Sequence, residues 1–180
     1  MATKFTIPTP EEYAPFYADY VQRASQRDDI NSALSSQIEE ILNALDPLTD
    51  SQARFKPGPE EWSIKEVIGH LNDGERVFSY RLLRISRGDV TPLPGFEQED
   101  YVRAAGFDNS PLQDLISEFE YLRRANGIAI RHMTAEAIER CGMASGATVS
   151  ARALIHILIG HVDHHIASLQ EKYLPVARTL

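Results

Sequence analysis

Apolar side chains recur every three or four residues along most of this chain, and no segment alternates strictly between apolar and polar residues. Spacings of three and four place side chains on one face of an α-helix, whereas a half-buried strand needs a period of two. The helical spacing is sustained in four stretches, near 34–45, 64–88, 112–133 and 154–169. We therefore expect an all-α protein in which four amphipathic helices pack as a four-helix bundle.

Local signals mark the ends of these helices. Ser63 and Glu66 have the spacing of a capping box, and Pro111 is expected at the first helical position of the third helix. The stretch RFKPGPEEW predicts a loop, and so does the small-residue stretch CGMASGATVS before the last helix. Four aromatic residues at i, i+3, i+4 and i+7 predict a further short N-terminal helix near 10–23.

The connection 89–109 is long for a helical bundle and contains two prolines, two glycines and an acidic cluster. Long connections in compact domains are often functional. Its length also permits a crossover, so the helices need not alternate up and down along the chain.

Length and charge restrict the class of protein. A chain of 180 residues can bury one sizeable core, so we expect a single domain over 1–180 with the bundle core at about 30–173. A net charge of −8 gives no support for phosphate contacts, so nucleic-acid binding is not expected. No apolar run approaches the roughly 20 residues that span a bilayer, and no membrane association is expected.

Two features bear on the compartment. The start MATKFTIPTPEEY lacks the apolar segment of a secretory signal. The chain has one cysteine, Cys141, which cannot form an internal disulfide and so suits a reducing environment. We therefore expect a cytoplasmic protein, with Cys141 as a buried or incidental thiol.

Three of the six histidines fall within five residues, in GHVDHH. His161 and His165 are four residues apart, so they share a helix face, as two ligands of one metal ion must. On a wheel of roughly 100° per residue, both lie at the edge of the apolar stripe. His164, His156 and Asp163 fall on the outward side. The sequence therefore favours His161 and His165 as metal ligands, although this spacing also arises by chance.

A metal site needs a third protein ligand, with the remaining positions left to water or substrate. His70 is the first candidate because it lies at the boundary of its helix's apolar face, where neighbouring helices meet. His132, near the end of the third helix, is the reserve candidate.

Glu75 is unusual because it lies within the apolar stripe of its helix. A buried carboxylate needs a partner, so we expect either an ion pair with an arginine or a proton-transfer group beside a polar site. The basic run on the same helix is expected to form a solvated face; it comprises Arg76, Arg81, Arg84 and Arg87.

Two stretches together carry a family resemblance: PGPEEWSIKEVIGHLNDGE, and GHVDHHIASLQ some ninety residues later. Over roughly 30–173 the chain resembles the DinB/YfiT-like superfamily. The resemblance implies an up-down-down-up bundle and one divalent metal ion held by His70, His161 and His165. It also implies that 89–109 helps to line the pocket and that two chains pair as a homodimer. Nitrogen ligands suit zinc, nickel, copper or iron, of which zinc or nickel is expected here.

Members of this superfamily include thiol transferases that use a low-molecular-weight thiol. The resemblance therefore implies a metal-dependent thiol S-transferase acting on a small-molecule substrate, with the metal favouring the thiolate. A metal-dependent hydrolase is the next alternative. A non-catalytic binding protein for a small molecule or metal, and a dimeric stress protein with incidental histidines, remain open as well.

Overall fold

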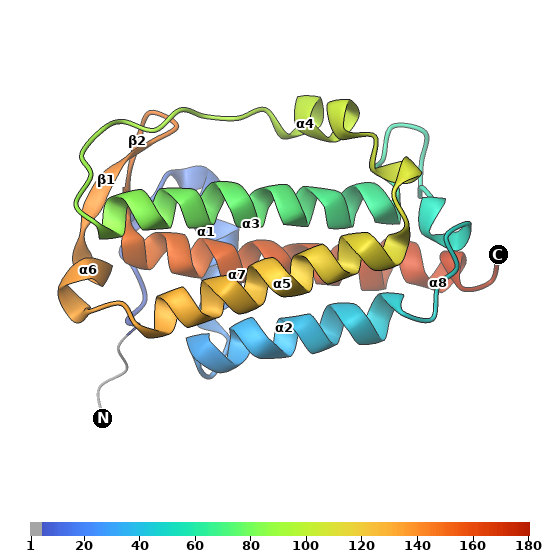
Figure 1. The fold of residues 1–180 in the computed structure, drawn as a ribbon, viewed down its shortest axis with the longest axis horizontal. Coiled ribbons are helices and arrows are strands. Elements are labelled where there is room, and N and C mark those ends of the chain that lie inside the picture. Colours follow the sequence, from blue (N-terminus) through green and yellow to red (C-terminus); the bar gives the residue numbers. More distant parts are fainter. Residues whose placement is uncertain (1–4) are drawn as a thin grey trace.

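The computed structural model describes residues 5–180, and within them four long helices form a bundle (Figure 1). They are α2 (Ile30–Leu45), α3 (Ile64–Ser86), α5 (Leu112–Arg131) and α7 (Ala151–Ser168). Each contains one of the predicted apolar stripes, which confirms the four-helix bundle. The first four residues of the predicted 1–180 domain lie outside the described residues, and with them the beginning of the segment MATKFTIPTPEEY, in which no secretory signal is expected.

The helices are arranged up-down-down-up, as the family resemblance implies. Helices α2 and α7 run one way along the bundle, and α3 and α5 run the other way (Figure 1). Helix α3 packs against α5 and α7, and α2 packs against the same two helices from the opposite corner. Because α3 and α5 are parallel neighbours, the chain must return along the whole bundle between them.

That return is the connection 89–109, which lies across one side of the bundle (Figure 1). It contains a helix that the sequence analysis missed, α4 (Gln98–Ala105), followed by a 3₁₀ turn at Phe107–Asn109. Helix α4 buries only Val102, so it has no apolar stripe that could reveal it.

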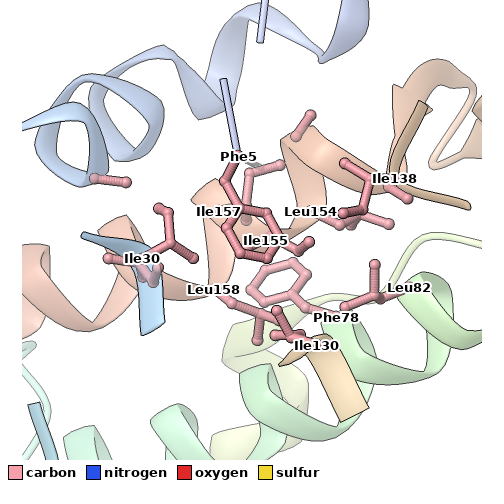
Figure 2. Packing of buried hydrophobic residues seen from close by; sticks show 14 of the residues in the cluster. Phe5, Ile30, Phe78, Leu82, Ile130, Ile138, Leu154, Ile155, Ile157 and Leu158 are labelled. Atoms are coloured by element: carbon pink, nitrogen blue, oxygen red, sulfur yellow. The ribbon is translucent and has the colours of Figure 1, made fainter. Parts of the chain in front are cut away.

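Two apolar clusters fill the interior. Figure 2 shows part of the first, where Phe78 of α3 lies among Ile130 of α5 and Ile155 and Leu158 of α7. The second cluster includes Ile68 of α3 together with apolar residues of α2, α5 and α7. Burying such side chains stabilises the fold by about 25 cal/mol for each Å² of apolar surface removed from water.

The last long helix, α7, is buried on more of its faces than a helical wheel with a single apolar stripe predicts. Helix α1 (Ala18–Ser25) packs along α7, and Phe5 joins the first apolar cluster. The predictions that His156 and Asp163 point outward were therefore wrong. His156 is only 1% exposed, and Asp163 is ion-paired with Arg27 in the segment between α1 and α2.

The stretch predicted as a loop before α7 is instead a β-hairpin, preceded by α6 (Ala135–Glu139). Its strands are β1 (Cys141–Ala144) and β2 (Ala147–Ser150), joined by Ser145 and Gly146 with φ of 53° and 77°. Positive φ at both central residues matches the right-handed twist of a hairpin. The backbone of Leu93 bonds to β1 and to the turn, which fixes the start of the long connection to the hairpin.

Several helix boundaries differ from the predictions. The predicted N-terminal helix begins only at Ala18, after short 3₁₀ turns at Pro10–Glu12 and Pro15–Tyr17. Pro111 is the N-cap of α5 rather than its first residue, and the Asp50 carboxylate accepts a hydrogen bond from the first helical amide. The Ser63 capping box of α3 is confirmed.

Helix α7 also extends further than expected, through a π-helical turn (Leu169–Tyr173) into α8 (Leu174–Ala177). The basic run on α3 is not wholly solvated, because Arg81 is buried and donates to the carbonyl of Pro94. Across residues 5–180, none of the helices combines the length and apolarity that crossing a membrane requires.

Candidate metal centre

Three histidines from two helices converge at one point between α3 and α7. The ring centroids of His70 and His161 are 4.9 Å apart, those of His70 and His165 5.0 Å, and those of His161 and His165 4.8 Å. One nitrogen from each ring lies within 4.8 Å of the others. The structure thus brings the three predicted ligands together. The reserve candidate His132 is exposed at the C-terminal end of α5 and does not join them.

The sequence positions these rings for simple reasons. His161 and His165 are one turn apart on α7, so their side chains lie one above the other. On α3, Gly74 provides the room that the His161 ring occupies, because a Cβ there would lie 2.7 Å from His161 Cε1. A glycine inside a helix lowers stability relative to alanine, so its presence in a predicted helix indicates a packing reason. The position of Gly74 inside α3 is the sequence signal for its close contact with His161.

Burial keeps the three imidazoles neutral. His70 and His161 are each 3% exposed, and their Nε2 atoms are 2.9 Å apart, so one ring donates a hydrogen bond to the other. Burial, with a smaller contribution from the charge of His164, lowers the pKa of His70 to about 4. Burial also lowers the pKa values of His161 and His165 well below the usual range. Neutral imidazole is the form that binds metal ions.

Aromatic rings surround the three histidines. Trp62, which precedes α3, packs against His70 in a tilted contact with ring centroids 4.7 Å apart. The ring of Tyr20 in α1 contacts the rings of both His161 and His164, with ring centroids 5.4 Å apart in each pair. His164 itself points away from the centre toward Asp19, as predicted. Neither Trp62 nor Tyr20 could be predicted as a site residue, because neither lies on the helices that carry the histidines.

A cavity of about 290 Å³ opens beside His70 and His161. Helices α1 and α3, the hairpin turn and the long connection all contribute to its lining, so the prediction that 89–109 lines a pocket is confirmed. Five aromatic residues form its walls: Phe16, Tyr17, Tyr20, Phe78 and Phe96. Glu97, Gln98 and Glu99, which are exposed residues at the start of α4, border it.

Glu75 is ion-paired, as one of the two sequence alternatives predicts. Arg123 donates from Nη1 to Glu75 Oε1 at 2.6 Å, and Asn126 donates to the other carboxylate oxygen at 2.7 Å. Burial raises the pKa of Glu75, and Arg123 and Asn126 oppose that rise. Arg123 also donates to Gln37 and to the carbonyl of Leu158. The carboxylate is therefore part of a structural polar network across the bundle.

Cys141 lies outside the centre. It is exposed on β1, with its Sγ 3.7 Å from the carbonyl oxygen of Glu139. Desolvation, together with the nearby carboxylates, raises its thiol pKa. A nucleophilic cysteine needs the opposite shift, so Cys141 is an incidental thiol, as one of the predicted alternatives had it.

The residues at the centre fit a divalent metal ion. They are three neutral nitrogen donors on rigid helices, and Gly74 prevents a side chain from filling the space beside His161. A set of three protein ligands also leaves coordination positions free, and the adjoining cavity could supply molecules to them.

The metal-free protein is expected to lose stability as the pH falls from about 6.5 toward about 4. An unfolded chain protonates its histidines below about pH 6.5, whereas the folded chain keeps its buried imidazoles neutral. The unfolded state thus binds more protons, and acid favours it. Urea unfolding of chelator-treated protein at about pH 7.5 and about pH 5.5 measures the difference.

His165→Gln provides the control for this prediction, because it removes one of the imidazoles whose pKa is lowered in the folded protein. Its free energy of unfolding should depend less steeply on pH than that of the unchanged protein. Equal free energies of unfolding at the two pH values in the unchanged protein would contradict the prediction.

Comparison with known proteins adds a family and a fold. A family model described as the DinB superfamily matches residues 33–169. Among solved structures, YfiT from Bacillus subtilis is described as a probable metal-dependent hydrolase with an unusual four-helix bundle topology. It aligns with a TM-score of 0.74 and 15% sequence identity over 89% of this chain and 91% of that chain. No curated protein matches the sequence. At this identity the likeness to YfiT concerns the fold.

Proposed function

Because the chain belongs to the DinB superfamily, we propose that it binds one divalent metal ion through His70, His161 and His165 and hydrolyses a small-molecule substrate. The observation that carries the proposal is the convergence of three neutral imidazoles, two buried and one half-buried, beside a cavity. A metal ion held by three nitrogen ligands supplies Lewis-acid chemistry at the positions it keeps open. Zinc or nickel is the expected metal.

The chain's own residues would hold and orient the substrate. The aromatic walls of the cavity lie beside His70 and His161, and an apolar part of the substrate would pack against them. Glu97 and Glu99 lie at the border, where they can accept hydrogen bonds from polar substrate groups. The description of YfiT as a probable metal-dependent hydrolase agrees with this reaction class.

Thiol S-transfer, the reaction that the family resemblance implies, is the second candidate. The same nitrogen ligands would favour the thiolate of a low-molecular-weight thiol, and an aromatic cavity also fits an electrophile. Hydrolysis is placed first because carboxylates border the cavity and no lysine or arginine is found among its described lining residues. Small thiols that carry carboxylates would be repelled there.

Turnover distinguishes these reactions. Tag-free protein loaded with zinc or nickel is assayed against a panel of small esters and amides, and against electrophiles with added thiols. The proposal predicts hydrolysis without thiol and a loss of about 100-fold or more in His70→Ala. Thiol-dependent product would support the transferase, and tight binding without any conversion would support a non-catalytic binding protein.

A homodimer, a cytoplasmic location and the absence of nucleic-acid partners stay predictions of the sequence. Gel filtration with light scattering measures the first of these directly.

A further inference from the structure

The cavity beside the three histidines combines aromatic walls with an acidic border. The aromatic rings follow one another in edge-on contacts, with centroids 5.2 Å apart for Phe16 and Tyr17, 6.1 Å for Tyr17 and Phe78, and 6.4 Å for Phe78 and Phe96. The faces of such rings carry negative electrostatic potential. A ring whose face is turned to a ligand in this cavity therefore presents partial negative charge to it.

The carboxylates add full negative charge at the border. Glu99 accepts a hydrogen bond of 3.1 Å from the indole nitrogen of Trp62, whose ring packs against His70. This bond orients the Glu99 carboxylate relative to the histidines. Glu97 is exposed at the N-terminal boundary of α4, and it too lines the cavity.

Cations of the protein do not balance this charge within the lining. The described residues around the cavity include no lysine or arginine. Arg81 approaches the Phe96 ring at 5.7 Å, yet it lines a different cavity, and its guanidinium donates to the Pro94 carbonyl and to Ser145 Oγ. The lining side chains therefore supply negative charge and no lysine or arginine; a divalent ion at His70 and His161 would offset part of that charge from one side, which is why binding is to be measured with and without metal.

We propose that this cavity binds a small organic cation, with its ammonium group held between the aromatic walls and the Glu97 and Glu99 carboxylates. Aromatic rings and carboxylates together are the groups that recognise quaternary ammonium ions. A volume of about 290 Å³ restricts the ligand to a small molecule. That this cation is the substrate rests on the proposed function, whereas the binding of the cation in the cavity is independent of it.

A pair of probes isolates the charge from the shape. Choline and 3,3-dimethylbutan-1-ol are nearly isosteric, but only choline carries a positive charge. Calorimetric titration of the whole protein, with and without zinc, gives both affinities, and the fluorescence of the single tryptophan, Trp62, gives an independent readout. Choline is expected to bind at least about fivefold more tightly.

The double variant Glu97→Gln/Glu99→Gln removes both charges, while the side-chain amide oxygen introduced at position 99 can still accept the hydrogen bond from Trp62. The preference for choline should fall severalfold, and the affinity for the neutral alcohol should not change. Asp100→Asn is the matched control, because Asp100 lies on the same helix but not in the cavity lining. It should behave like the unchanged protein.

The outcomes separate this inference from the proposed function. Equal affinities, a preference for the alcohol, or no binding of either probe would overturn the cation site, whether or not metal binds. A clear preference for choline in a protein that binds no metal would support the cation site and remove the basis for metal-dependent hydrolysis.

Discussion

Arg123→Met is expected to lower the free energy of unfolding by about 3–5 kcal/mol, because it leaves a charge buried without its partner. Glu75 is 1% exposed, and Arg123 is its cationic partner at 2.6 Å. Asn126 would remain as a neutral donor, but it cannot balance the carboxylate charge. Urea unfolding at neutral pH, followed by circular dichroism, measures the loss.

The double variant Glu75→Met/Arg123→Met tests whether charge is the reason. It removes both ions and fills the space with apolar atoms, so it should be more stable than Arg123→Met alone. A double variant that loses the sum of the two single effects would contradict the explanation. Metal binding should survive in the folded fraction of all these variants, because Glu75 pairs with Arg123.

Gly160→Ala is expected to destabilise the protein by about 3 kcal/mol or more, through a clash between two backbones. Helix α7 passes so close to α1 at this point that an added Cβ would overlap the Tyr20 carbonyl and lie 2.6 Å from Tyr20 Cα. Backbone atoms cannot rotate away as a flexible side chain can. Helix α1 must therefore move, and Tyr20 moves with it away from His161.

Gly127→Ala is the matched control for this clash. Gly127 lies within α5, and apart from its own helix backbone nothing lies within 4 Å of the position that its Cβ would take. Alanine favours a helix over glycine, so this variant should gain about 0.5–1 kcal/mol. A Gly160→Ala protein as stable as the unchanged one would show that α1 does not pack on α7 at this distance.

The parts of the site that could be predicted lie on single helices. The four-residue spacing of His161 and His165 establishes a shared face without any knowledge of the fold. His70 could be proposed from its place at the edge of an apolar stripe and from the family resemblance. Pairing of Glu75 with an arginine could be predicted as a class, because a buried carboxylate needs a partner, but the sequence did not identify Arg123.

The parts that could not be predicted depend on distant segments meeting in space. Trp62, Tyr20 and Glu99 come from three separate segments, and no local spacing connects them. His156 was placed outward because a helical wheel assumes one buried face, whereas α1 and the N-terminal segment cover α7. The hairpin was missed because its small residues lack apolar alternation, and the Ser145–Gly146 pair indicates a turn without specifying a hairpin.

The metal content of tag-free protein tests the central claim most directly. The protein is loaded with zinc or nickel, dialysed, and measured by elemental mass spectrometry. We expect close to one ion per chain, its loss in His161→Ala, and its retention in His132→Ala, which removes an exposed histidine outside the cluster. Less than stoichiometric metal in the unchanged protein, or equal metal in His161→Ala, would contradict a metal centre at these three histidines.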